Sequence, residues 1–301
     1  MREILPTRLS CRPFTVAEAL DAGVTRQRLR RSDLRAPFHG ARVAATPATL
    51  HDRCRALAPL LETDQFVSHI TSAALWGLPL PPRYASTDVP LHVTSIRRRE
   101  PRRSGVTGHR DPRAPDPARL GSIPVSTPVR AWTECRTLLD LDDLVIVGDA
   151  LVGRWSETAG ASGLPLRDLE AASAACLGKG TRRLQESLAL VRVGSRSPAE
   201  TRLRLLLARG GIPEPELNFE ARTPSGTWLG IVDFAFPDQR LGLEYEGEHH
   251  FSDIATFHAD IERRERFAEA GWRTIRVTSE HLRQPDALVA RVRRHLLRLS
   301  S

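Results

Sequence analysis

The chain has 301 residues, 41% of them hydrophobic and 27% charged, a balance typical of folded globular proteins that excludes a largely disordered chain. No run of 18 apolar residues and no N-terminal signal peptide occur in the sequence, so we expect a cytoplasmic protein without membrane contact. Four scattered cysteines form no C-x-x-C pair, which predicts reduced thiols rather than disulfides or a structural zinc site.

The net charge of +8 is unevenly distributed along the chain. Residues 197–301 hold 15 basic and 16 acidic residues, so 29 of the 44 basic and 20 of the 36 acidic residues lie before them. A positive excess in the first two thirds predicts phosphate contacts with double-stranded DNA. The alternative is codon usage in a GC-rich genome, because Lys179 is the single lysine and every other basic residue is arginine.

Residues 13–50 predict a winged helix-turn-helix unit. The first helix is expected to begin after Thr15, with Glu18 three residues later, and to end at Gly23. Thr25 predicts a second, arginine-rich helix of the kind that enters the major groove, and residues 38–44 predict a β-wing strand. The alternative is a solvated basic helix in a plain helical hairpin. The candidate DNA contacts in this helix are Arg26, Arg28, Arg30 and Arg31.

Residues 51–196 predict a mixed helical and β middle domain. Apolar helical stretches occupy 49–62 and 68–81, a strand is expected at 91–95, and residues 126–154 predict one or two helices. Arginines crowd the segment that follows the strand, which is typical of a solvated loop or of a phosphate-binding one. Arg98 and Arg99 are the candidate phosphate contacts there.

The last domain, 197–301, begins with well-marked helix signals. Ser197 suits the N-cap, Pro198 the first helical position and Glu200 the third. Beyond a linker at 212–222, strands are expected at 231–236 and 241–246, a helix at 260–270, a strand at 273–278 and a helix from 285. This order predicts a mixed α/β domain and makes the whole chain a multidomain α/β protein.

The two strands at 231–246 carry acids among apolar residues. Alternation puts Val232, Phe234 and Phe236 on one face and Asp233 on the other, where the short turn brings it to Glu244. Carboxylates this close raise each other's pKa unless a cation lies between them, and Mg²⁺ prefers such oxygen ligands. The alternative is an exposed sheet face with solvated acids.

This pattern resembles the PD-(D/E)xK nuclease superfamily, and "LEYEGEHHF" followed by Asp260, Arg263 and "GWRTIRVT" looks like its Vsr-like endonuclease branch over residues 197–299. The resemblance implies that Asp233 and Glu244 bind Mg²⁺ or Mn²⁺ with the Tyr245 carbonyl. It further implies that Glu200 completes the acidic cluster and that His250 transfers a proton or orients water, with His249 a bystander.

Two positions depart from that resemblance or leave it open. Glu246 stands where the superfamily carries lysine, which implies a third ligand, an acidic general base, or a site that binds without cutting. Asp260 and Arg263 lie one helical turn apart and imply either an orienting ion pair, with Arg263 near a phosphate, or a purely structural pair.

The front of the chain has a resemblance of its own. "FTVAEALDAGVTRQRLRRSDL" is similar to the winged helix of AbiEi-type antitoxins, and "VSHITSAALWGLPLP" and "IPVSTPVRAWTECRTL" look like the segment that follows it. In that family the domain binds DNA, often as a transcriptional repressor of a toxin operon. Two functions follow as expectations: a metal-dependent DNA endonuclease, or a regulator with a degenerate nuclease-fold domain whose partner is a cognate toxin or a second copy of the chain.

Overall fold

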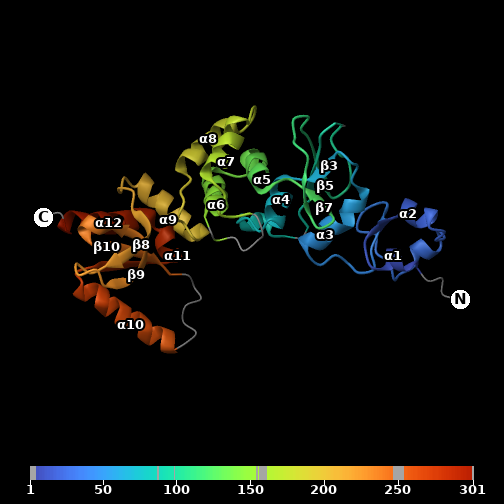
Figure 1. Ribbon diagram of the computed structural model, residues 1–301. Helices are drawn as coiled ribbons and strands as arrows, with labels where there is room; N and C mark the ends of the chain where they lie inside the picture. Colours follow the sequence, from blue (N-terminus) through green and yellow to red (C-terminus); the bar gives the residue numbers. More distant parts are fainter. Residues whose placement is uncertain are drawn as a thin grey trace.

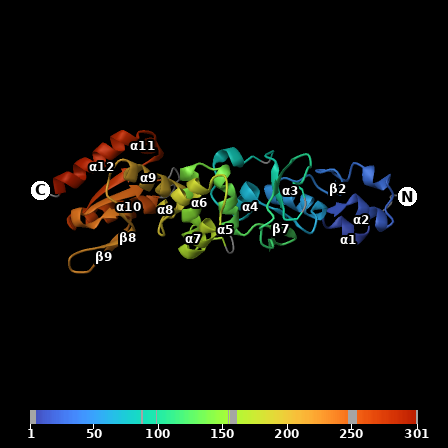
Figure 2. The ribbon, with the colours of Figure 1, turned by 90° about the horizontal axis from the view of Figure 1, so that it is seen from above.

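The computed structural model describes residues 5–86, 88–97, 99–153, 155, 161–246 and 254–299, with the backbone alone at 254–259 and 298–299. In this part of the chain the secondary structure is mixed α/β and is organised around three sheets. The three sheets and their helices follow one another in chain order along an elongated molecule (Figures 1 and 2). Among the described residues, no helix has both the length and the apolar character needed to cross a bilayer.

The N-terminal unit is built from short elements. Thr15 caps the first predicted helix, because its hydroxyl accepts the N–H of Glu18 at 3.0 Å, and Gly23 follows with φ +82°. The second predicted helix is wrong: Arg28–Arg30 form one 3-10 turn, after which the chain is extended at Arg31. The unit comprises α1 (Thr7–Ser10), β1 (Phe14–Thr15), α2 (Val16–Asp21), the 3-10 turn Arg28–Arg30 and β2 (Ala41–Arg42).

The predicted wing is a single short strand paired with the start of the chain. β2 runs antiparallel to β1, with Phe14 opposite Arg42. Phe38, Ala41 and Val43 pack in the core of the middle unit rather than in the core around Phe14. The wing therefore joins the first unit to the second instead of standing apart from it.

The middle unit has a five-stranded sheet of order β5-β4-β3-β7-β6, covered and extended by helices. A capping box between Thr49 and Asp52 starts α3, and Asp140 caps α6. Of the one or two helices expected within 126–154, the structure has two, α5 and α6. The elements are α3 (Leu50–Leu57), β3 (Gln65–Val67), α4 (His69–Leu75), β4 (Leu91–Ser95), β5 (Val106–Arg110), β6 (Ala118–Leu120), β7 (Ile123–Val125), α5 (Pro128–Glu134), α6 (Leu141–Val152), α7 (Leu166–Ala174), α8 (Thr181–Leu190) and 3-10 turns at Ala58–Leu60, Pro82–Tyr84 and Cys135–Thr137.

The loop that connects β4 to β5 packs against the backbone of β5. The two strands are parallel, with Thr94 opposite His109, so the arginine-rich segment between them must cross back. It does so against Gly108, where an added Cβ would lie 2.1 Å from the carbonyl oxygen of Pro101. Glycine is required there by this close approach of two backbones.

The C-terminal unit is a four-stranded sheet of order β11-β10-β9-β8, with β10 parallel to β11 and antiparallel to β9. Helix α10 lies on one face, and α9 and α12 lie on the other (Figure 1). Strand β8 occupies the expected linker, a wrong prediction caused by the prolines before it. The elements are α9 (Pro198–Arg209), β8 (Glu216–Arg222), β9 (Trp228–Phe236), a 3-10 turn Pro237–Gln239, β10 (Leu241–Tyr245), α10 (Ile254–Glu269), β11 (Arg273–Val277), α11 (Ser279–Arg283) and α12 (Pro285–Leu299).

Alternation along β9 breaks at Asp233. Phe234 and Phe236 pack with Leu243 beneath α9 and α12, as predicted, but Val232 packs with Phe267 beneath α10. The predicted common face of Val232, Phe234 and Phe236 is therefore wrong. Opposite the break, Asn218 on β8 has φ +49°, so both strands change face at the same point.

A buried ion pair fastens the middle unit to the C-terminal unit. Asp149 on α6 accepts from Arg204 and from the Thr201 hydroxyl of α9, each at 2.8 Å, and from the N–H of Arg192 at 2.8 Å. The Asp149 and Arg204 side chains are 0% and 4% exposed. Because α9 also contributes Leu203 to the core beneath the C-terminal sheet, one helix belongs to both units.

Candidate functional site

Three carboxylates predicted from the sequence converge at one end of the β9–β10 pair. Regular pairing of these strands ends at Phe234 and Leu243, and at the next position Asp233 Oδ2 accepts the N–H of Tyr245 at 2.8 Å. Glu244 follows on β10, and Glu200, in the first turn of α9, lies near enough for its charge to raise the pKa of Asp233. The strand break thus turns Asp233 toward acids on two different elements.

Asp233 is the carboxyl most disturbed by this arrangement. Its pKa is raised to about 6, chiefly by burial and in addition by the charges of Glu200 and Glu244, while the Tyr245 N–H and Arg263 act in the opposite direction. Its negative charge is therefore incompletely compensated in the folded protein. A cation bound beside it would be stabilised by the same charges.

Glu244 and Glu200 are already held by neighbours. Arg263 of α10 donates to Glu244 at 2.5 Å and to the carbonyl of Ile231 at 2.6 Å, which fixes the glutamate beside the strand break. Glu200 accepts from the Ser197 hydroxyl at 3.0 Å and from the N–H of Arg196 at 2.9 Å. Glu244 is thus positioned by an arginine of α10, and Glu200 by residues at the N-terminus of its own helix.

The remaining acids of the sequence motif belong to an arginine network instead. Glu246 pairs with Arg276 of β11 at 2.5 Å, and Arg276 also pairs with Asp260, which contacts Arg264. Asp260 and Arg263 therefore do not form the predicted pair with each other: Asp260 pairs with Arg264 and Arg276, and Arg263 pairs with Glu244. His249 and His250 lie outside the described residues.

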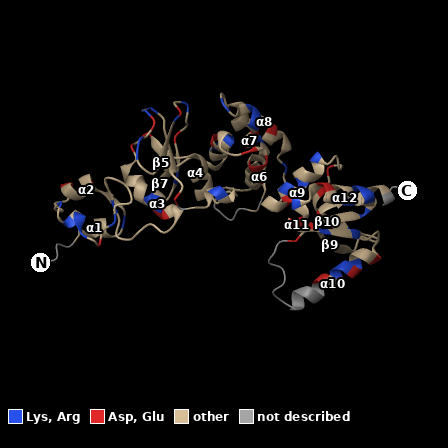
Figure 3. Cartoon of the chain, turned by 180° about the vertical axis from the view of Figure 1, so that it is seen from behind, with Lys and Arg blue, Asp and Glu red and all other residues tan. Residues whose placement is uncertain are grey.

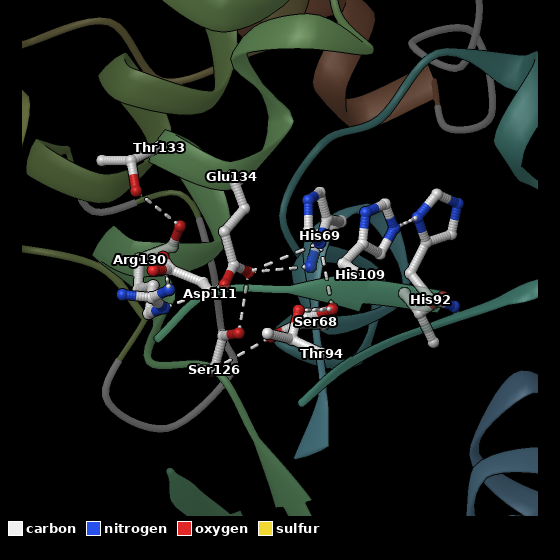
Figure 4. Close-up of polar contacts among 12 residues, drawn as sticks. Ser68, His69, His92, Thr94, His109, Asp111, Ser126, Arg130, Thr133 and Glu134 are labelled. Atoms are coloured by element: carbon white, nitrogen blue, oxygen red, sulfur yellow. Dashed lines mark hydrogen bonds and ion pairs between the residues drawn. The ribbon is translucent and has the colours of Figure 1, made fainter. Parts of the chain in front are cut away.

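A second group of potential metal ligands lies apart from the acidic cluster. Within the described parts of the chain, three potential ligands lie mutually within 4.8 Å in one place, and that place is not the acidic cluster. It is a group in the middle unit formed by His69, His92 and His109, which we call the histidine cluster. Figure 4 shows these rings from α4, β4 and β5 beside a network of buried polar side chains.

The histidine cluster is tightly packed. His92 Nδ1 and His109 Nε2 lie 2.9 Å apart, and the rings of His69 and His109 are stacked with centroids 3.7 Å apart. Burial, followed by the charge of His109, lowers the pKa of His92 to about 4. Burial also lowers the pKa of His109 and, with the neighbouring histidines, holds that of His69 well below its ordinary value. The rings are therefore neutral at pH 7.

His69 adopts an unusual backbone conformation to take this place. Its φ of +51° lies in the left-handed region, which costs a non-glycine residue on the order of 1 kcal/mol or more. Glu134, a buried residue of α5, accepts the His69 N–H at 2.9 Å and the Ser126 hydroxyl at 2.7 Å, and Arg130 donates to it at 2.8 Å. Such a conformation persists only where its surroundings hold it, and here they do.

The arginines predicted to contact DNA fall into two groups. Arg28 is buried and forms a two-bonded ion pair with Asp33 at 2.8 and 3.0 Å, which argues against its predicted role as a phosphate contact. The others in this unit, Arg26, Arg30 and Arg31, are exposed. Arg26 and Arg30 line a cavity of about 530 Å³ together with Val16, Leu29, Ala36, His39, Gly40 and Arg42.

The arginine-rich loop of the middle unit lies next to this cavity. Arg103 donates to the carbonyl of His39 at 2.6 Å, which links the loop to the wing. Arg99 is exposed, and Arg98 lies outside the described residues. Basic segments thus mark both the first unit and the loop beside β5 (Figure 3).

Comparisons with known proteins identify relatives without a described activity. Two uncharacterized proteins of Mycobacterium tuberculosis, from two strains, are each 35% identical to the chain over 101 residues. The matched stretch spans 33% of this chain and 37% of each relative, so about a third of the relatives' length is covered. No family model matches the sequence, and no solved structure matches it.

Sequence reasoning missed Arg276 and the histidine cluster. Arg276 lies opposite Glu244 in the parallel β10–β11 pair. To predict this contact, one must know that the strands before and after α10 are neighbours in one sheet. The histidines come from three separate elements, so no spacing in the sequence marks them as a set. His92 is one of five buried residues in β4, and a polar side chain within this strand was the one local signal.

Proposed function

We propose that the protein binds double-stranded DNA with its basic N-terminal two thirds and hydrolyses a phosphodiester bond at the acidic cluster Asp233, Glu244 and Glu200. The proposal includes a PD-(D/E)xK, Vsr-like fold in the last unit, and in the first unit a winged helix-turn-helix whose second helix is reduced to the 3-10 turn Arg28–Arg30. Its main support is Asp233, a half-buried carboxyl on a central strand whose pKa of about 6 reflects partial burial and two nearby acids. Perturbed carboxyls of this kind concentrate at functional sites.

The donor set fits a hard divalent cation such as Mg²⁺ or Mn²⁺. Asp233 and Glu244 each use one oxygen in the bonds to Tyr245 and Arg263 and have a second oxygen that can bind a cation. One or two carboxylates completed by waters and substrate phosphate are the usual Mg²⁺ ligands. When bound, the ion would polarise the scissile phosphate and make a water molecule more acidic.

The chain's own residues would then orient the substrate. Arg263 is 29% exposed and lies at the edge of the cluster, where it can bind a phosphate oxygen while it holds Glu244 in place. Arg276 brings a guanidinium to Glu246, the position at which the superfamily carries lysine. We propose that this arginine of the neighbouring strand supplies the positive charge that Glu246 lacks.

One observation favours the second candidate function, a DNA-binding regulator or antitoxin with an inactive nuclease-like domain. Arg263 and Arg276 neutralise Glu244 and Glu246 within the protein, so these two acids need no metal. In that case the last unit would serve as an interaction surface for a cognate toxin or a second copy of the chain. The two functions differ in whether Asp233 is needed for phosphodiester cleavage.

The test is cleavage of supercoiled and linear DNA by the full-length protein with Mg²⁺ or Mn²⁺. Asp233→Ala is the test variant, and Asp238→Ala, in the exposed turn after the same strand, is the matched control. Nicking that requires metal, survives in the control and disappears in the test variant is expected. If no variant cuts and all three proteins bind DNA equally, the regulator becomes the preferred function.

A further inference from the structure

We propose that the histidine cluster His69, His92 and His109 is a binding site for a divalent transition-metal ion of the Zn²⁺ class, with one coordination position left open. The site lies in the middle unit and shares no residue with the acidic cluster, so it does not rest on the proposed nuclease activity. Two geometric observations carry the proposal: the spacing of the ring nitrogens and the support behind His69.

The nitrogen spacing is close to that of a metal centre. His92 Nδ1 and His109 Nε2 are 2.9 Å apart, and one nitrogen from each of the three rings lies within 4.8 Å of the other two. Zn–N bonds of 2.0–2.1 Å at a tetrahedral angle would separate two nitrogens by about 3.3 Å. An ion can therefore replace the proton between His92 and His109 after the two rings move apart by a few tenths of an ångström.

His69 has the support that a metal-binding histidine usually needs. Its Nδ1 lies 2.9 Å from Ser68 Oγ and 4.0 Å from the Glu134 carboxylate. Ser68 Oγ in turn accepts a hydrogen bond from Thr94 Oγ1 at 2.8 Å. The Ser68 hydroxyl at hydrogen-bond distance from Nδ1, with the Glu134 carboxylate nearby, favours the tautomer that presents Nε2 as the ligand. Because His69 is stacked on His109, its ring must turn about the Cβ–Cγ bond to direct that nitrogen at the ion.

The ligand set selects the class of metal. Three imidazoles suit Zn²⁺, Ni²⁺ or Cu²⁺ and not Mg²⁺, which prefers oxygen. Three protein ligands leave the fourth tetrahedral position to water or to a small anion, as in zinc sites that are not purely structural. His92 is buried, whereas His69 and His109 are partly exposed, so the open position faces the side from which solvent can enter.

The parallel β4–β5 pair explains how the site is assembled. His92 on β4 lies two residues before Thr94, which is opposite His109, so both histidines point to the same side of the sheet. The Glu134 bond to the backbone of His69 brings the third ring from α4 to that side. Sheet register and one strained residue together converge three side chains that are far apart in the sequence.

The first test is metal titration of tag-free, full-length protein after chelator treatment, with Zn²⁺ by calorimetry and Co²⁺ by visible absorption. His109→Gln is expected to lose one equivalent of tight binding, and Ser68→Ala to weaken that equivalent about tenfold. His51→Gln, an exposed histidine on α3, is the matched control and should bind as the wild type does. Equal stoichiometry and affinity in His109→Gln and His51→Gln would overturn the proposal.

A second measurement needs no variant and therefore no assumption about folding. X-ray absorption of the wild-type protein loaded with one equivalent of Zn²⁺ should show three imidazole nitrogens at about 2.0–2.1 Å. Coordination dominated by oxygen, or a protein that takes up no Zn²⁺ at micromolar concentration, would exclude the site.

Discussion

Replacing Asp233 with asparagine is expected to stabilise the folded protein at neutral pH, although it removes the central acid of the proposed site. In the folded protein the pKa of Asp233 is raised from an ordinary 3.8 to about 6. Between these two pH values the unfolded chain has released a proton that folded Asp233 keeps. The free energy of unfolding of the wild type therefore falls as the pH rises through this window, and the loss is complete above it.

The size of the effect follows from the width of the window. The difference between a pKa of 3.8 in the unfolded chain and about 6 in the folded protein lowers the free energy of unfolding by about 3 kcal/mol at pH 7.5, and by about half of that at pH 5. Asparagine avoids this penalty because it carries no charge, and its carbonyl oxygen can still accept the Tyr245 N–H. The expected gain in the free energy of unfolding is of this size and grows with pH.

The assay is urea denaturation at pH 5 and pH 7.5, followed by tryptophan fluorescence, since Trp272 is buried beside the sheet. Asp238→Asn, at an exposed position, should leave the free energy of unfolding unchanged at both pH values. A gain of equal size at both pH values, or a loss at pH 7.5, would refute the reasoning. Either result would mean that the carboxylate of Asp233 is well compensated in the folded state.

Three further predictions test other parts of the structure. Asp149→Ala should lower the free energy of unfolding by about 3–5 kcal/mol, because Arg204 would stay buried without a partner; a loss below about 1 kcal/mol in urea denaturation contradicts this. Gly108→Ala should displace the arginine-rich loop, seen as faster hydrogen exchange at 96–105, and unchanged exchange would show that the backbones can separate without cost. Arg30→Ala should reduce the salt dependence of DNA affinity by about one phosphate contact, whereas Arg28→Ala should lower stability and leave that slope intact; identical slopes in wild type and both variants would remove Arg30 from the interface.

Signals confined to a few neighbouring residues predicted the regular elements well. Ser197 and Thr15 cap the helices that follow them, as predicted. An N-cap depends only on a side-chain oxygen and a free backbone N–H three residues later, so it can be read from the local sequence. Period-two alternation placed Phe234 and Phe236 correctly on one face of β9, beneath α9 and α12. The predicted proximity of Asp233 and Glu244 is supported by the charge of Glu244, which raises the pKa of Asp233.

The errors arise where partners are distant in the sequence. Alternation failed at Asp233 because Asn218, on another strand, takes a left-handed conformation opposite it. The second N-terminal helix failed because Arg28 turns inward to Asp33 instead of extending a basic face. The acids expected to bind metal acquired arginine partners from α10 and β11, and the histidine cluster depends on a strand register that no local pattern contains.

The helix shared by the middle and last units has a consequence for where the protein would act on DNA. Glu200 and Arg204 lie one turn apart on α9, so the Asp149 bond that anchors this helix also fixes the position of one acid of the proposed site. The acidic cluster therefore cannot swing freely on a tether relative to the middle unit. If the proposed function holds, the protein would cleave at a fixed number of base pairs from the DNA sequence that it binds. Mapping of the cleavage positions around a bound site would then give one distance and not a range of distances.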